Sequence, residues 1–359
     1  MEFRPGGHPW GLNRVVKPKG VLPQSADRLE ASLPIFDNEI LVSVSKLQID
    51  AASLRQLMGE IPSSPPLSNL SAGCVAEGGG GGFLAQKILA IVAERGKMHN
   101  PKTNSGGVFL GTVEAIGPGH PQAKELRIGD PVVSLVSLTL TPLSIKEIGM
   151  VDEKKGQISV SGSAIVFESG SVRKMPADLS EGAVLAAWDV CGGPAQVKRT
   201  VREGEKILII GLGKAGKAMA CMAEEVGALV YGVDADLSAV AWCQANIKGH
   251  FAALDATHPM EVYTWVNEMT RGALADVAVN SASIEGTEMS GVVSCRDGGK
   301  ALFFGMRTSF QKTVLGAEGI GKDVLLLMGS GYVPGHAELM LNLLRNHKPL
   351  QKWFEEKFG

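Results

Sequence analysis

The sequence lacks a strong excess of charge of either sign. Thirty-five Lys and Arg residues stand against 37 Asp and Glu residues, which gives a formal net charge of -2. A balance so close to zero provides no electrostatic footprint for nucleic acid or for an anionic membrane surface. We therefore expect neither of them as a partner.

Long apolar runs are also missing. The most apolar stretch, residues 132–145, is too short for a spanning helix and contains Ser, Thr and Pro. The first eleven residues, MEFRPGGHPWG, lack the apolar core of a secretory signal. Cysteine is scarce: there are five, widely scattered, and no C-x-x-C pair occurs, which argues against a disulfide framework and a thiolate zinc site. These absences favour a cytoplasmic location.

Glycine, by contrast, is abundant. The chain has 45 glycines in 359 residues, about one in eight, against a usual share of roughly 7%. Because 45% of the residues are apolar, the chain can bury sizeable cores. The surplus therefore indicates many special backbone positions in a folded protein.

The two halves of the chain have different patterns. Residues 38–157 contain short β-type runs separated by Gly, Pro and Asp, which is typical of an antiparallel, barrel-like domain. Within this half, the five glycines at 78–82 predict a surface loop, and residues 84–92 predict a helix. After Trp188, apolar strands alternate with amphipathic helices, which predicts a doubly wound parallel sheet and an α/β fold class.

The most informative motif is a glycine-rich turn, Gly211-Leu-Gly213-Lys-Ala-Gly216. It follows an apolar strand at 207–210 and opens a helix, as a dinucleotide-binding turn does. The first glycine permits the tight turn, the second lets the pyrophosphate approach, and the third lets the helix pack on the strand. The backbone of Lys214 and Ala215 would then offer free N–H groups to the phosphates. The alternative is a turn that only connects strand and helix.

An acid ends the next strand, at Asp234, which is 234 − 211 = 23 positions after Gly211. Such a carboxylate accepts hydrogen bonds from both ribose hydroxyls of NAD and repels the 2′-phosphate of NADP. No Arg or Lys lies between Asp234 and Asn246, so we expect NAD in preference to NADP. The ends of two later strands should line the same crevice, and they supply four further candidates for cofactor binding, Ser281, Ala282, Gly305 and Met306.

Several segments resemble the medium-chain dehydrogenase/reductase superfamily: Gly111–Gly119, Leu126–Asp130 and Val201–Lys206. The resemblance implies a GroES-like β-barrel-type domain over 1–187 and 331–359, and a Rossmann domain over 188–330. It also implies a homodimer, in which the apolar edge strand at 322–329 pairs with a second copy and is covered.

The zinc ligands of the alcohol-dehydrogenase branch are absent. By position they fall on Asp50, on Gly107-Val108, and on or near Ala186. A catalytic zinc needs about three protein ligands, and one carboxylate does not supply them. We therefore predict that no metal is bound.

Three further sets of segments narrow the resemblance: Asn13–Pro23, Leu33–Leu41 with Leu47–Ser53, and Arg95–Pro101 with Ser105–Gly107. Together they are similar to the L-erythro-3,5-diaminohexanoate dehydrogenase family, a zinc-free branch. The resemblance implies NAD-dependent oxidative deamination of a diamino acid at C3, giving 5-amino-3-oxohexanoate and ammonia.

This chemistry requires groups that hold two ammoniums and take up a proton. Asp50 is a candidate base or ammonium anchor, although a helix-capping Asp has the same local sequence. Asp189 lies at the expected domain junction, where members of the superfamily contact the nicotinamide end of the cofactor, and is a second candidate; a structural Asp within a helix is equally open. We expect Ser53, His99 and Asn100 to contact the substrate, although His99 could equally be a surface histidine. Lys97 is a possible partner for the substrate carboxylate.

Two other functions remain open from the sequence. One is a zinc-free quinone or enoyl reductase that uses NADPH, against which Asp234 argues. The other is a non-catalytic nucleotide-binding protein that retains the same fold.

Overall fold

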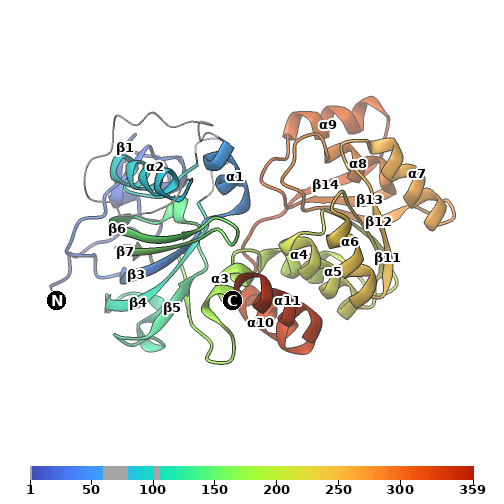
Figure 1. Ribbon diagram of the computed structural model, residues 1–359. Coiled ribbons are helices and arrows are strands. Elements are labelled where there is room, and N and C mark those ends of the chain that lie inside the picture. The colour runs from blue at the N-terminus through green and yellow to red at the C-terminus, as the bar shows by residue number, and fades with distance from the viewer. Residues whose placement is uncertain (1, 60–79, 101–105) are drawn as a thin grey trace. The chain divides into compact units, whose positions relative to one another are not determined.

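The structure, a computed structural model, describes residues 2–59, 80–100 and 106–359. The chain forms two compact units, each with its own core (Figure 1). The first unit comprises Met1–Leu185 and Lys357–Gly359, and the second comprises Ala186–Glu356.

The first unit is built on an antiparallel sheet of six strands in the order β6-β7-β3-β4-β5-β8. The strands are β3 (Ile40–Gln48), β4 (Val108–Ile116), β5 (Pro131–Ser134), β6 (Leu143–Asp152), β7 (Gln157–Val166) and β8 (Val172–Lys174). Central β3 contributes Ile40, Val42, Val44 and Leu47 to one buried cluster. β3 pairs antiparallel with both β4 and β7, and bulges interrupt its register, which confirms the predicted antiparallel domain.

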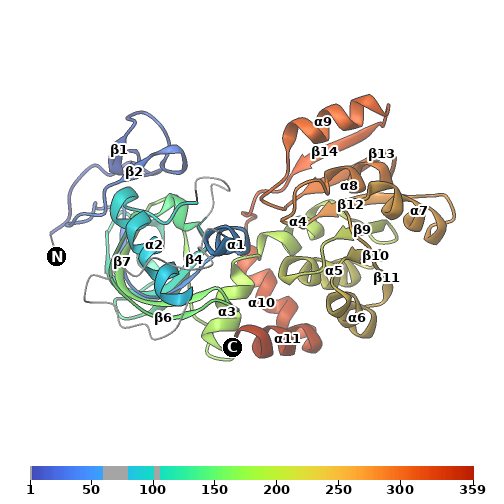
Figure 2. The ribbon, with the colours of Figure 1, turned by 45° about the horizontal axis from the view of Figure 1, so that its top comes forward.

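Two helices accompany this sheet, α1 (Ala51–Gly59) and α2 (Gly80–Arg95), and α2 packs against β6 (Figure 2). The predicted loop at 78–82 is wrong for Gly80–Gly82, because α2 already begins at Gly80. Residues 78 and 79 lie outside the described residues. The reason is the apolar face of the following turns, where Leu84, Ile88 and Val92 are buried at helical spacing and outweigh the low helix propensity of glycine.

The N-terminal segment adds β1 (Val15–Lys17), β2 (Arg28–Leu29) and the 3₁₀ turn η2 (Pro23–Ser25). A buried ion pair fastens this segment to the start of the sheet. Arg14 Nη2 lies 2.7 Å from Glu39 Oε2, and both side chains are almost completely inaccessible. Two of the segments that carry the family resemblance are therefore joined directly.

The second unit contains a parallel sheet in the order β11-β10-β9-β12-β13-β14, as a doubly wound fold requires. Its strands are β9 (Lys206–Ile210), β10 (Leu229–Asp234), β11 (Gly249–Ala253), β12 (Ala275–Asn280), β13 (Cys295–Phe303) and β14 (Val324–Met328). The helices between them are α5 (Lys214–Val226), α6 (Leu237–Asn246), α7 (Pro259–Met269), α8 (Glu288–Ser294) and α9 (Phe310–Gly319). The prediction of a Rossmann sheet is confirmed.

Four more helices lie outside this alternation: α3 (Glu181–Trp188), α4 (Gly192–Thr200), α10 (His336–Asn346) and α11 (Lys348–Phe358). The sequence assigned 331–359 to the first domain, and the structure corrects this for residues 331–356. α10 packs against α4 and α5, and Trp188 Nε1 donates to Ala337 O at 3.1 Å. These contacts bury the apolar face of α10 in the second unit, and only residues 357–359 return to the first.

No helix within the described ranges is long and apolar enough to cross a membrane.

Candidate cofactor and substrate sites

The glycine-rich turn has the geometry that its sequence predicts. Gly211 has a φ of +87°, a left-handed conformation that side chains disfavour. A Cβ atom on Gly216 would lie 1.8 Å from the carbonyl oxygen of Gly211, so α5 can approach β9 only because this residue is glycine. Gly213, the N-cap of α5, has no atom within 4 Å of the place where its Cβ would be. The open N-terminus of α5 therefore fits the pyrophosphate of a nicotinamide dinucleotide.

Asp234 at the end of β10 is tied to this turn. Its Oδ2 accepts a hydrogen bond from the backbone N–H of Leu212 at 2.6 Å, and its Oδ1 accepts one from that of Asp236 at 2.8 Å. A carboxylate has about four acceptor sites, so both oxygens retain capacity for ribose hydroxyls. The structure thus holds the predicted acid in a fixed orientation beside the glycine-rich turn.

The ends of β12 and β13 complete the cofactor side of the unit. Ser281 Oγ donates to the carbonyl oxygen of Gly211 at 2.8 Å. A Cβ on Gly305 would lie 2.2 Å from the carbonyl oxygen of Ala282. A Cβ on Gly211 would lie 2.9 Å from the backbone nitrogen of Ala282, so Ser281 and Ala282 contact the glycine-rich turn, and Gly305 packs against Ala282. Met306 follows them with 52% of its surface exposed.

Two predicted residues of the second unit form an ion pair. Lys214 is the first residue of α5, and its Nζ lies 2.6 Å from Asp189 Oδ2. The side chains are only 13% and 9% exposed, so solvent screens this pair weakly. Nearby, burial first and the charge of Asp189 second raise the pKa of the Cys191 thiol, which keeps that thiol protonated. No sequence pattern indicates that the candidate catalytic acid Asp189 and the candidate cofactor-binding residue Lys214 contact each other.

Asp50 in the first unit caps helix α1. Its Oδ1 accepts the backbone N–H of Ser53 at 2.9 Å, and its Oδ2 accepts the Ser53 hydroxyl at 2.6 Å. Ser53 is completely buried, whereas Asp50 is half-buried. The capping role that the sequence left open is therefore present, and the carboxylate keeps acceptor capacity for an ammonium as well.

His99 lies in a buried position, not on the surface. Its Nδ1 is 2.5 Å from Thr139 Oγ1, and desolvation, followed by the charges of Lys97 and Arg95, lowers its pKa to about 4. The imidazole is consequently neutral near pH 7 and can exchange hydrogen bonds, but it is not a cation there. Asn100 is buried beside it in the chain.

A two-glycine segment connects these candidates. A Cβ on Gly107 would lie 3.0 Å from the backbone nitrogen of Asp50, and one on Gly106 would lie 2.5 Å from the carbonyl oxygen of Met98. Gly106–Gly107 therefore packs between the Asp50 turn and the segment that carries His99. The structure brings the four first-unit candidates, from two distant parts of the chain, to one region.

Lys97 has a structural role that the sequence did not suggest. Its Nζ donates to the carbonyl oxygens of Pro23 and Gln24 at 2.5 and 3.2 Å, and the side chain is completely buried. Burial lowers its pKa to about 8. Because its donors face backbone carbonyls, the expectation that Lys97 binds the substrate carboxylate is not supported.

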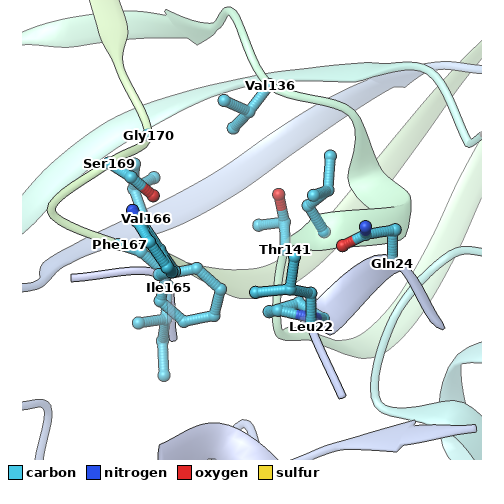
Figure 3. A pocket seen from close by; sticks show the side chains of 12 residues that line it. Leu22, Gln24, Val136, Thr141, Ile165, Val166, Phe167, Ser169 and Gly170 are labelled. Atoms are coloured by element: carbon cyan, nitrogen blue, oxygen red, sulfur yellow. The ribbon is translucent and has the colours of Figure 1, made fainter. Parts of the chain in front are cut away.

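The first unit also contains a cavity of about 430 Å³, lined by Leu22, Phe167 and other apolar residues, with Gln24, Thr141 and Ser169 as polar members (Figure 3). None of its twelve lining side chains is charged. A diamino acid carries two ammoniums and a carboxylate, and burying such charges without partners is costly. This cavity is therefore unsuited to that substrate.

No group of three potential ligands among His, Cys, Asp and Glu is close enough to hold a metal ion in the part of the chain that the structure describes.

Comparison with known proteins identifies close relatives over the full length. The family model of the L-erythro-3,5-diaminohexanoate dehydrogenase N-terminal domain matches residues 13–66 and 68–176. A protein of Acetoanaerobium sticklandii named L-erythro-3,5-diaminohexanoate dehydrogenase is 39% identical over 359 residues, covering 98% of this chain and 99% of its own. A protein of the same name from Fusobacterium nucleatum is 40% identical over 357 residues and 98% of each chain.

Solved structures share the fold at low identity. The CurK enoyl reductase matches with a TM-score of 0.54 and 17% identity, over 89% of this chain and 81% of its own. Alcohol dehydrogenase TADH from Thermus sp. ATN1 matches with a TM-score of 0.55 and 18% identity, over 91% of this chain and 87% of its own. The Escherichia coli quinone oxidoreductase complexed with NADPH matches with a TM-score of 0.52 and 15% identity, over 86% of this chain and 79% of its own. The architecture is that of the medium-chain dehydrogenases and reductases, and the chain belongs to the L-erythro-3,5-diaminohexanoate dehydrogenase family.

Proposed function

We propose that this dehydrogenase oxidatively deaminates L-erythro-3,5-diaminohexanoate at C3, with NAD as the acceptor. The observation that carries the proposal is the full-length identity of 39–40% to two relatives that bear this name. The quinone and enoyl reductases share only the fold, at 15–17% identity, so they do not favour the reductase alternative. A non-catalytic protein would bind a nucleotide at the same glycine-rich turn, so the identity to two relatives named as dehydrogenases is what supports an enzyme over that alternative.

The reaction balances with water as the second reactant. A nicotinamide dinucleotide held at the glycine-rich turn would supply the acceptor for the hydride of C3. Loss of one ammonium proton and of the hydride leaves an iminium, and its hydrolysis gives 5-amino-3-oxohexanoate and ammonium. One proton is released overall, so the protein must supply a group that accepts it.

The chain's own residues meet these needs in the following way. The N–H groups at the start of α5 receive the pyrophosphate, and Asp234 receives the ribose hydroxyls. We assign the proton transfer and the ammonium contacts to Asp50 and Asp189, with Ser53, His99 and Asn100 as the polar surroundings of Asp50. No metal ion takes part in this proposal.

Preference for NAD over NADP rests on Asp234. Two backbone N–H groups fix its carboxylate, so it cannot easily turn away from a 2′-phosphate. A second negative charge beside it would be repelled at short range.

A homodimer is part of the proposal. β14 is the outer strand of its sheet, and its Leu325 and Met328 are 58% and 57% exposed. Pairing with β14 of a second copy would cover this apolar edge. We also propose a cytoplasmic location, because the four cysteines of the described residues are buried free thiols, as a reducing compartment maintains them.

The test is an assay of the purified protein with L-erythro-3,5-diaminohexanoate and NAD. We expect reduced cofactor and ammonia to appear in equal amounts, and a much lower rate with NADP. Absence of both products would overturn the proposed activity, and NADH formation without ammonia would indicate oxidation at a carbon that bears no amine.

A further inference from the structure

Lys217 is a buried lysine to which neither the sequence motif nor the proposed mechanism gives a role. It lies on α5, directly after the last glycine of the turn, and only 3% of its surface is exposed. Its Nζ donates a hydrogen bond to the carbonyl oxygen of Leu212 at 2.5 Å. The lysine thus reaches back from the helix into the turn that precedes it.

Two tryptophans enclose the ammonium. Lys217 Nζ lies 5.5 Å from the ring centroid of Trp242 on α6 and 4.9 Å from that of Trp353 on α11. Both distances are within the range of cation–π attraction. Three separate helices of the second unit therefore meet at this one side chain.

Stability alone does not account for a charge in this position. Desolvation lowers the pKa of Lys217, although the negative charges of Asp234 and Asp236 oppose that shift. An apolar side chain of similar length would fill the same space without that cost, and such replacements of buried charges are often neutral or stabilising. The hydrogen bond to Leu212 is therefore the feature that requires explanation.

Both backbone polar groups of Leu212 are held by charged side chains. Its N–H is bound by Asp234 at 2.6 Å, and its carbonyl oxygen is bound by Lys217. The Leu212–Gly213 peptide bond is trans, so the C=O of Leu212 and the N–H of Gly213 point in opposite directions. When the Leu212 carbonyl is held toward the buried ammonium, the N–H of Gly213 is directed away from that ammonium. Gly213 itself is exposed, and no atom lies within 4 Å of the place where its Cβ would be.

We propose that Lys217 is a positioning residue for the cofactor: by holding the Leu212 carbonyl inward, it directs the Gly213 N–H toward the pyrophosphate. The inference deepens the proposed function, since it rests on binding of a nicotinamide dinucleotide at this turn. The positive charge of Lys217 also lies close behind a site that receives an anion.

The experiment measures the equilibrium dissociation constant of NADH for the wild type, Lys217→Met and Lys217→Gln, with the melting temperature of each. Lys217→Met retains the packing between the tryptophans but loses the donor, and we expect NADH affinity to fall about tenfold, as for loss of a charge-assisted hydrogen bond. Lys217→Gln retains a neutral donor and should lose less. At saturating NAD, kcat should change less than KM for NAD.

Lys300→Met is the matched control. Lys300 also donates to a backbone carbonyl, that of Thr200 at 3.1 Å, within the same unit but on β13. We expect its NADH affinity to equal that of the wild type.

The outcomes separate the two proposals. A wild type that does not bind NADH would contradict the proposed cofactor. Normal affinity in a folded Lys217→Met protein would overturn the positioning role and leave the proposed function standing. If that variant fails to fold, Lys217→Gln decides: normal affinity contradicts the role, and weakened affinity at an unchanged melting temperature supports it. Parallel losses of affinity and melting temperature, or a similar loss in Lys300→Met, would indicate a merely structural lysine.

Discussion

The Asp189 carboxylate lies 2.6 Å from the Lys214 ammonium at the first residue of α5. The pair links α5, the helix proposed to receive the cofactor phosphates, to the segment that follows α3. A cation at this helix end is opposed by the helix dipole, and the buried partner carboxylate compensates for it. The lysine proposed for cofactor binding and the carboxylate proposed for proton transfer are thus electrostatically coupled.

Replacing Asp189 with Asn removes one charge of this pair and keeps its size. We expect kcat/KM for diaminohexanoate to fall at least about tenfold, because an amide cannot accept the proton and the rate enhancement that a general base contributes is lost. Affinity for NADH should stay equal or increase, because Lys214 is released to interact with phosphate. Steady-state kinetics and NADH titration check this, and a kcat/KM within a few-fold of the wild type would remove Asp189 from the mechanism.

Asp50→Asn separates capping from charge. Asparagine caps helices about as well as aspartate, so the melting temperature should change little. A neutral amide does not pair with an ammonium, so we expect KM for the diamino acid to rise about tenfold or more. Ser53→Ala is the converse variant: it removes a hydrogen bond of the cap but keeps the Asp50 charge, so the melting temperature should fall and KM should rise less than in Asp50→Asn. If Asp50→Asn kept the wild-type KM, Asp50 would be only a helix cap.

Asp234→Asn tests the choice of cofactor. The amide oxygen can still accept one backbone hydrogen bond, but the charge that opposes a 2′-phosphate is gone. We expect the ratio of kcat/KM for NAD to that for NADP to fall about tenfold, as the loss of one close charge repulsion implies. The two rates measured with the same substrate give this ratio, and an unchanged ratio would mean that another group selects NAD.

His99 should make stability depend on pH. Its folded pKa of about 4 lies below the ordinary value near 6.5, so the unfolded chain binds the proton more tightly. The contribution of the neutral His99 to folding stability is therefore complete above about pH 6.5, and it is lost as the pH falls toward 4. Between pH 7 and pH 5 we expect His99 to account for a loss of about 2 kcal/mol in the free energy of unfolding.

Urea unfolding of the wild type and His99→Asn at the two pH values measures this difference. His258, whose side chain is 61% exposed, provides the control variant His258→Gln, which should behave as the wild type does. An equal pH dependence in His99→Asn and the wild type would contradict burial of a neutral imidazole.

Arg14→Met should destabilise the first unit strongly. It leaves Glu39 buried without its bidentate partner, which costs about 3–5 kcal/mol. Arg4→Met is the control, because the Arg4–Glu30 pair is 3.6 Å long and both side chains are partly exposed. Equal melting temperatures for the two variants would show that the buried pair contributes little.

Local sequence determined the glycine-rich turn and the acid that follows it. Gly211, Gly216 and Asp234 act through their own backbone geometry and through neighbours a fixed number of residues away, so spacing alone predicts them. The same holds for the alternation of strands and helices, whose periods arise from short-range geometry. Asp50 was also placed before a helix start, because its cap partner Ser53 is three residues away.

Only the tertiary structure decided which distant groups meet and what burial does to them. Lys214 meets Asp189 across 25 positions, and Lys217 meets a tryptophan near the C-terminus, because the folded sheet brings their helices together. The low pKa of His99 and the burial of Lys97 depend on how much water the surrounding chain excludes. The C-terminal helices joined the second unit because α10 finds its apolar partners there. Such contacts and desolvation depend on the whole packed fold, and no local pattern of residues encodes them.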